Sequence, residues 1–204
     1  MHAEVDETLR AITERLTAAG VSYFVGGSIA TTIFGEARMT RDIDIVIVLR
    51  VEQVDALVAR LEPDFVADGD LARAAIEASI VRAEESAFNV IYLPYSFKVD
   101  LFVHQSSPWR DAELERRIAI AFGDGREAFS VFVASPEDMV LQKLRWYRMT
   151  GERSDRQWRD VQGVLLEQGD ALDAAYMRRF APEAGVADLL ERVLADAGLA
   201  EGEP

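Results

Sequence analysis

The sequence predicts a mixed α/β (α+β) domain, with a mixed sheet and flanking helices, followed by a C-terminal helical domain. Helical and strand periodicities interleave irregularly in the first part of the chain, whereas no strand pattern follows Ala134. Residues 135–138 (SPED) are a strong helix start, with serine as N-cap and proline at the first helical position. We therefore place the domains at 1–134 and 135–200 and expect the tail 201–204 to be disordered.

The first 80 residues predict four helices and two strands. Apolar residues recur at helical spacing in the first helix, which Gly20 ends, and Pro63 ends the third. The second strand alternates and then becomes continuously apolar, as a central strand does. The expected helices are 3–19, 28–34, 51–61 and 70–79, and the expected strands are 22–25 and 40–49.

Two hairpins and five helices are expected in the rest of the chain. Residues 87–93 and 97–103 are rich in β-formers and are joined by a short PYS link, which favours a hairpin. A second hairpin is expected around GDG at 123–125, although its first strand could equally extend the preceding helix. The remaining segments are the helix 108–116, the hairpin strands 117–122 and 128–133, and the C-terminal helices 136–149, 155–168, 171–181 and 186–197.

Composition narrows the class of protein. There is no long apolar run for a membrane span, and the N-terminus lacks the basic and apolar regions of a secretory signal. The absence of cysteine excludes disulfides and thiolate chemistry, and two histidines disfavour an all-histidine metal site. These features fit a cytoplasmic protein.

The charge of the chain is strongly acidic and uneven. A net charge of −14 disfavours non-specific nucleic-acid binding. Residues 143–159, in contrast, carry a local net charge of +4. This basic stripe can hold a polyphosphate, or it can simply balance the charge on a helix surface.

Two aspartates on a predicted strand are the main candidates for chemistry. Asp42 and Asp44 point to one face, and three isoleucines form the opposite face. Charge placed in this way is costly unless it holds a cation or meets solvent. Carboxylate oxygens suit Mg²⁺, and two such aspartates can share two metals about 4 Å apart. Asp100, within another strand, is the best third carboxylate; the alternative is that the pair forms strand-edge ion pairs with Arg38 and Arg41.

The glycine pair before the aspartate strand makes the prediction of a ligand site more specific. Gly26, Gly27 and Ser28 stand at a strand-to-helix transition. Glycine there lets the backbone approach a ligand, and the start of the helix offers N–H groups to an anion. The serine can cap that helix or bind a phosphate oxygen. Lys98 shares the strand face of Asp100 and is a further candidate phosphate ligand, whereas His104 is expected to be a strand-end residue.

These motifs resemble those of the DNA polymerase β-like nucleotidyltransferase superfamily: a helix-starting G-[GS]-S, D-x-D on the next strand and a later aspartate. The form TRDIDIVI most resembles the bacterial minimal nucleotidyltransferases, including the AbiEii-type toxin group. The resemblance implies a nucleotidyltransferase-like fold, metal-bound NTP and nucleotidyl transfer. It implies that Asp42 and Asp44 bind the metals, and that Asp100 helps to bind one and activates the acceptor. Gly27 and Ser28 would hold the triphosphate.

The helical half resembles the same group. That group has a P-x-D-x₄-K-L helix and a later helix with an aspartate, here Lys143 and Asp160. By this analogy Lys143 binds triphosphate; the alternative is a lysine that snorkels beside an apolar stripe. The later helix departs from the K-D-x-x-D pattern because Gln157 replaces the first aspartate. Arg156 could simply pair with Asp160.

The expected reaction is Mg²⁺-dependent transfer of a nucleoside monophosphate from NTP to a hydroxyl, with two ions bound. Arg41 and Lys143 would offset the charge of the triphosphate. The acceptor (RNA, protein or small molecule) and the choice of NTP stay open, and a cognate antitoxin is a candidate partner. The alternatives are a module on the same fold that binds nucleotide or a protein partner without turnover, and an interaction protein whose helical half is active.

Overall fold

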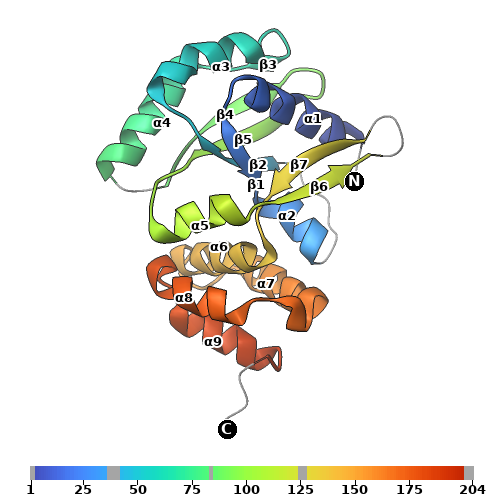
Figure 1. Ribbon diagram of the computed structural model, residues 1–204, viewed down its shortest axis with the longest axis vertical. Helices are drawn as coiled ribbons and strands as arrows, with labels where there is room; N and C mark the ends of the chain where they lie inside the picture. The colour runs from blue at the N-terminus through green and yellow to red at the C-terminus, as the bar shows by residue number, and fades with distance from the viewer. Residues whose placement is uncertain (1–2, 36–41, 83–84, 124–127, 200–204) are drawn as a thin grey trace. The chain divides into compact units, whose positions relative to one another are not determined.

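The computed structural model describes residues 3–35, 42–82, 85–123 and 128–199 of the chain. These residues form two compact units, the first made of 3–29 with 42–133 and the second of 30–35 with 134–199. Compactness does not show that a unit folds alone, so the division into domains at residue 134 stays a prediction. Figure 1 shows a sheet with helices in the first unit and a group of helices in the second.

The elements up to residue 133 confirm the predicted mixture of helices and strands. They are α1 (Ala3–Ala18), β1 (Ser22–Val25), α2 (Gly27–Phe34), β2 (Asp42–Val48), η1 (Val51–Gln53), α3 (Val54–Leu61), β3 (Phe65–Val66), α4 (Gly69–Arg82), β4 (Ser86–Tyr92), β5 (Phe97–Val103), α5 (Pro108–Arg116), β6 (Ile118–Phe122) and β7 (Phe129–Val133). Both predicted hairpins form, so the segment after α5 is a strand and not a longer helix. The short β3 was not predicted, because two residues are too few to show a periodicity.

The seven strands form one mixed sheet in the order β3-β4-β5-β2-β1-β7-β6. The pairs β2–β5 and β1–β7 are parallel, whereas β1–β2 and both hairpins are antiparallel. The aspartate strand β2 is therefore central, as its apolar sequence predicts. Because β5 is its parallel neighbour, two segments more than fifty residues apart in sequence lie side by side (Figure 1).

One face of the central strands is fully buried. Ile43, Ile45 and Ile47 of β2 have no exposed surface, and their register partners on β5 are equally apolar and buried. Helix α1 lies on this face, because the hydroxyl of Tyr92 on β4 donates a hydrogen bond to Glu7 of α1. Helices α3 and α4 continue the same layer beside α1. The alternate side chains of β2 and β5 consequently point to the opposite face.

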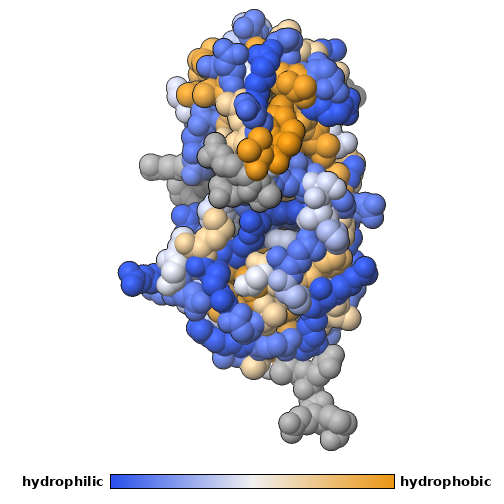
Figure 2. Space-filling view, turned by 90° about the vertical axis from the view of Figure 1, so that its left-hand side faces the viewer, coloured by the Kyte–Doolittle hydropathy of each residue, from blue (hydrophilic) through white to orange (hydrophobic). Residues whose placement is uncertain are grey.

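Apolar side chains also gather on the outside of the first unit, as Figure 2 shows in orange. Helix α4 buries two alanines and an isoleucine, but it leaves Leu71, Ile80 and Val81 exposed. Only part of its apolar surface is thus used in the core. Within the described ranges, no helix combines the length and the apolar character that a membrane span requires.

The described residues of the second unit contain helices and no strand. Its elements are residues 30–34 of α2, α6 (Pro136–Met149), α7 (Asp155–Gln168), η3 (Gly169–Ala171), α8 (Ala174–Ala184) and α9 (Ala187–Asp196). The predicted start of α6 is confirmed, since Ser135 accepts a hydrogen bond from the amide of Asp138. Helix α8 starts and ends later than expected, because Asp173 caps its start and the chain turns only at Gly185, where φ is +72°. Pro182 lies within its last turn.

We expect Ile45→Ala to lower the free energy of unfolding by about 2–5 kcal/mol, because it leaves a cavity in a face with no room to collapse. Urea denaturation followed by circular dichroism measures this change. Leu166→Ala is the control, since its side chain lies on the surface of α7 and should change stability by less than about 0.5 kcal/mol. Equal losses in both variants would contradict the buried position of β2.

Candidate functional site

The parallel register of β2 and β5 brings the three predicted aspartates together on one face of the sheet. Asp42 pairs with Lys98, and Asp44 pairs with Asp100. These four side chains form a square of neighbouring positions, because residues two apart on a strand share a face. The side chain of Asp42 is 57% exposed and that of Asp100 is 20% exposed. The four side chains therefore form a polar, solvent-accessible site at the start of β2 and β5, which we call the aspartate corner. The opposite face of these strands is apolar and buried.

Lys98 supplies the positive charge of this corner. Its Nζ lies 2.7 Å from Oδ2 of Asp100 and 3.9 Å from Oδ1 of Asp42. The hydrogen bond to Asp100 raises the pKa of Lys98, and the nearby carboxylates of Asp100, Asp42 and Asp44 act in the same direction against the effect of burial. The ammonium is therefore charged at neutral pH. Sequence reasoning placed Lys98 on this face but did not foresee its contacts with the aspartates.

The glycine pair lies directly against the second aspartate. Strand β1 runs antiparallel to β2 with Val25 opposite Ile45, so Gly26 follows beside Asp44 and donates its amide to the carbonyl of Asp44 at 2.9 Å. At Gly27 φ is +54°, and a Cβ there would lie 1.8 Å from Oδ2 of Asp44. Both the backbone conformation and the space therefore require glycine. The backbone is pressed against a carboxylate of the site.

Helix α2 begins beside this contact. It starts at Gly27, one residue earlier than expected, so Ser28 occupies its second position and not the cap. The serine is only 6% exposed. The first amides of a helix have no partner within the helix and carry partial positive charge, which suits an anion. The start of α2 thus brings anion-binding character next to Asp44.

The donor set suits a hard divalent cation. Carboxylate oxygens are the ligands that Mg²⁺ prefers, and three of them belong to one corner of the sheet. In the described part of the chain, no three His, Cys, Asp or Glu side chains are grouped closely enough to hold a metal ion. The ammonium of Lys98 already faces two of these carboxylates, at 2.7 Å from Asp100 and 3.9 Å from Asp42. The carboxylates therefore suit the ion by their chemistry, and the register sets them on one face of the sheet.

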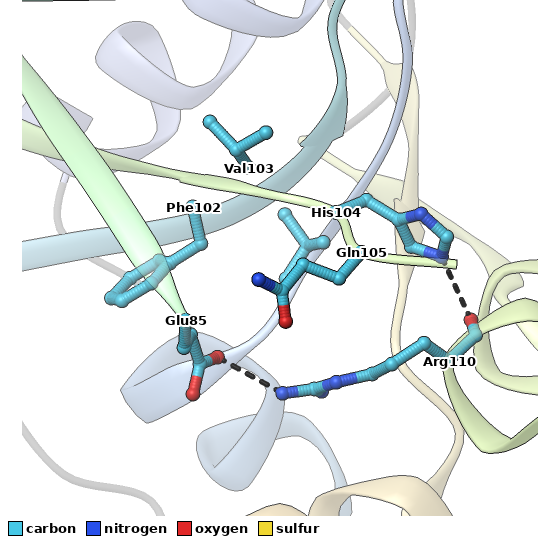
Figure 3. A pocket seen from close by; sticks show the side chains of 7 residues that line it. Glu85, Phe102, Val103, His104, Gln105 and Arg110 are labelled. Carbon is cyan, nitrogen blue, oxygen red and sulfur yellow. Dashed lines mark hydrogen bonds and ion pairs between the residues drawn. The ribbon is translucent and has the colours of Figure 1, made fainter. Parts of the chain in front are cut away.

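Beyond the aspartates, the same strands end in a buried charge cluster (Figure 3). Arg110 of α5 forms an ion pair with Glu85 at 3.1 Å, which Figure 3 shows. It forms a second one with Glu113 at 2.9 Å. His104 follows β5, as expected of a strand-end residue, and its Nε2 lies 3.1 Å from the carbonyl oxygen of Arg110. The small cavity between these residues, of about 10 Å³, has room for one water molecule. The cluster therefore joins α5 to the residue that precedes β4.

Sequence reasoning missed this cluster. Its one signal is the spacing of Arg110 and Glu113, which are three residues apart on the helix that Ser107 caps. The partner from outside the helix, Glu85, lies 25 residues away in sequence. Local spacing alone could not show that the pair is buried.

The second unit holds the other predicted lysine in a different environment. Nζ of Lys143 on α6 lies 2.7 Å from Oδ2 of Asp160 on α7, and the two side chains are 7% and 8% exposed. The aspartate thus pairs with Lys143, a contact that the sequence did not reveal. Trp158 is partly buried and packs against Tyr147 within this unit. Arg38 and Arg41 lie outside the described residues.

Comparison with known proteins identifies the family. The sequence model of the family described as "Nucleotidyl transferase AbiEii toxin, Type IV TA system" matches residues 3–199. The chain belongs to this family and is a nucleotidyltransferase, which confirms the resemblance in its motifs. Among curated proteins, nothing matches the chain.

Solved structures share the fold. An antigenic nucleotidyltransferase-like protein from Paracoccidioides brasiliensis is 17% identical with a TM-score of 0.53, covering 98% of this chain and 94% of that one. The solution structure of the antibiotic-resistance factor ANT(2'')-Ia is 14% identical with a TM-score of 0.53, covering 93% of this chain and 96% of that one. At these identities the likeness shows a nucleotidyltransferase-like fold.

We expect Gly27→Ala to destabilise the protein more than Gly20→Ala does. Both glycines have positive φ, which costs another residue about 1 kcal/mol or more, but only the Cβ at residue 27 collides with Asp44. Unfolding free energies measured in urea give the difference. The double variant Gly27→Ala/Asp44→Ala should recover part of the loss. Additive losses in the double variant would contradict the contact.

We expect Lys143→Met to lower the free energy of unfolding by about 3–5 kcal/mol, because it removes a buried counter-ion of Asp160. Arg148→Met is the control, since Arg148 pairs with Asp188 on the surface and should cost about 1 kcal/mol or less. Thermal and urea denaturation measure both variants. A loss as small as that of the control would show that the pair contributes little to the second unit.

Proposed function

We propose that this member of the AbiEii nucleotidyltransferase family transfers a nucleoside monophosphate from NTP to a hydroxyl acceptor, with Mg²⁺ held by Asp42, Asp44 and Asp100. The observation that carries the proposal is the register of β2 with β5, which sets Asp44 beside Asp100. The contact of Gly27 with Asp44 supports it, because it joins a carboxylate site to a helix start.

The triphosphate is proposed to bind at the start of α2. Gly26 and Gly27 have no side chains, so a phosphate group can approach the backbone there. The amides of the first turn carry partial positive charge and are proposed to donate to phosphate oxygens, and Ser28 lies in that turn. Arg41 is proposed to offset part of the remaining negative charge, whereas a role for Lys143 stays a prediction, because its ammonium is buried in the pair with Asp160.

The proposed reaction is an in-line displacement at phosphorus. The acceptor oxygen forms a bond to the α-phosphorus, the bond from that phosphorus to the β-bridging oxygen breaks, and pyrophosphate leaves. Asp100, which is less exposed than Asp42, is proposed to accept the proton of the acceptor hydroxyl. Two Mg²⁺ ions, when bound, supply positive charge that offsets the triphosphate.

The partners follow from this reaction and from the family. NTP is the donor, and the acceptor is an RNA, a protein hydroxyl or a small molecule. A cognate antitoxin is proposed as a protein partner, because the family is described as the toxin of a toxin–antitoxin system. The cytoplasm, which supplies NTP and Mg²⁺, is the proposed compartment.

The proposal predicts Mg²⁺-dependent transfer of label from an α-labelled NTP to a component of a cell extract, abolished by EDTA. Asp42→Asn, Asp44→Asn and Asp100→Asn should each lower the rate by about 100-fold or more, since each removes a charge that acts at the transferred phosphate. Gel autoradiography and pyrophosphate release measure the rate.

Asp170→Asn is the matched control, because it removes a carboxylate from the surface of the second unit. It should retain the wild-type rate. Transfer that survives Asp44→Asn would contradict the proposed site. Thermal stabilisation by NTP without transfer to any extract component would instead favour the non-catalytic binding module.

A further inference from the structure

The two lysine–aspartate pairs of this protein have the same nitrogen–oxygen distance but differ in their exposure to solvent. Lys98 and Lys143 are the two lysines of the chain, and each has its Nζ 2.7 Å from an aspartate oxygen. The Lys143 pair is buried, whereas the side chain of Lys98 is 46% exposed. A buried pair is costly to break, whereas an exposed pair contributes about 0–1 kcal/mol and exchanges readily. The pair at Lys98 is therefore the easier of the two to open, because its lysine is half exposed.

The ammonium of Lys98 also lies where a metal ion would contact the carboxylates. Its ammonium contacts Asp100 and lies 3.9 Å from Asp42, so it faces carboxylates from two different strands. These are two of the three residues proposed to bind Mg²⁺. An ammonium and a divalent cation cannot both occupy the space between the same oxygens, because like charges repel. Binding of a metal there therefore requires the lysine to leave.

We propose that Lys98 is a built-in counter-ion that holds the cation position between Asp42 and Asp100 until a divalent metal displaces it. This inference rests on the proposed function, because it assumes that these aspartates bind the metal. The lysine keeps three neighbouring carboxylates from repelling one another in the metal-free protein. It also sets the affinity for the metal, since each metal ion must compete with a tethered ammonium.

A bound triphosphate would offer the displaced ammonium a new partner. Lys98 lies opposite Asp42 in the register, on the face of the sheet that carries the carboxylates, and its four-carbon stem is flexible. A triphosphate bound with the metal would bring negative charge to this corner. The lysine would then exchange a carboxylate for a phosphate oxygen, so metal and NTP would favour each other's binding.

The test uses Mn²⁺ alone as the probe, because Mn²⁺ accepts the same oxygen ligands as Mg²⁺ and its free ion gives an electron paramagnetic resonance signal. Lys98→Met keeps the length of the stem and removes the charge. Two unit charges about 4 Å apart change a binding constant by about fivefold even at the dielectric constant of water, and a divalent ion doubles that energy. We expect Lys98→Met to bind Mn²⁺ at least fivefold more tightly than wild type.

Two further variants sharpen the result. Lys98→Arg keeps the positive charge and should bind Mn²⁺ within about twofold of wild type. Arg73→Met is the charge-matched control, because Arg73 pairs with Asp55 and Asp70 on the outer helices and its loss changes the net charge by the same amount. It should leave the Mn²⁺ affinity unchanged. Thermal unfolding confirms that each variant is folded.

A second readout follows the lysine itself. Reductive ¹³C-methylation labels the two lysines and the N-terminus, and the Lys98→Met spectrum identifies the Lys98 signal. Addition of the diamagnetic Mg²⁺ should shift that signal and leave the Lys143 signal in place. A Lys98 signal that does not respond, or a Mn²⁺ affinity that is equal or lower in Lys98→Met, would overturn the inference.

The outcomes separate this inference from the proposed function. Nucleotide transfer that depends on Asp42 and Asp44, together with equal Mn²⁺ affinity in wild type and Lys98→Met, would overturn only the role of Lys98. Mn²⁺ binding that tightens in Lys98→Met without any nucleotide transfer would support the counter-ion and contradict the proposed reaction. Absence of Mn²⁺ binding from both proteins would overturn the metal site and the counter-ion together.

Discussion

The register between β2 and β5 is the constraint on which the candidate site depends. It sets Asp44 beside Asp100 and Asp42 beside Lys98. A slip of one residue would turn a carboxylate toward the buried face and an isoleucine toward solvent. The apolar residues of the two strands therefore hold the register through their burial. The same packing that forms the core positions the charges of the site.

The antiparallel pairing of β1 with β2 adds the second part of the site. It ends β1 next to Asp44, so the glycine pair and the start of α2 lie against that carboxylate. Negative oxygens and the positive end of a helix thus meet at one corner of the sheet. A ligand that carries both a divalent cation and phosphate groups has charges that match both halves.

The two lysine–aspartate pairs show that burial decides whether an ion pair is fixed or can exchange partners. In the second unit, Lys143 and Asp160 are shielded from solvent and join α6 to α7. In the first unit, Lys98 is partly exposed and faces two carboxylates. The first pair contributes to packing, and the second can exchange partners. The distance alone, which is 2.7 Å in each pair, does not distinguish them.

Much of the fold could be predicted from the sequence by itself. Periodicity located the helices and both hairpins, Ser135 predicted the start of α6, and the alternation of aspartate with isoleucine showed that β2 has one charged face. The motif around Gly27 and Asp42 indicated the family. These features are local, because capping, turn chemistry and strand alternation depend on residues a few positions apart.

Only the tertiary structure decided which of these residues meet. It placed Asp100 beside Asp44, brought the ammonium of Lys98 between two carboxylates and paired Lys143 with Asp160. It also showed that Gly27 is required by its contact with Asp44 as well as by its φ. Strand order, register and burial depend on the whole core, and residues far apart in sequence carry no local pattern that records their contact. The sequence by itself therefore determined which chemical groups the site has, whereas packing of the core decided how they are arranged.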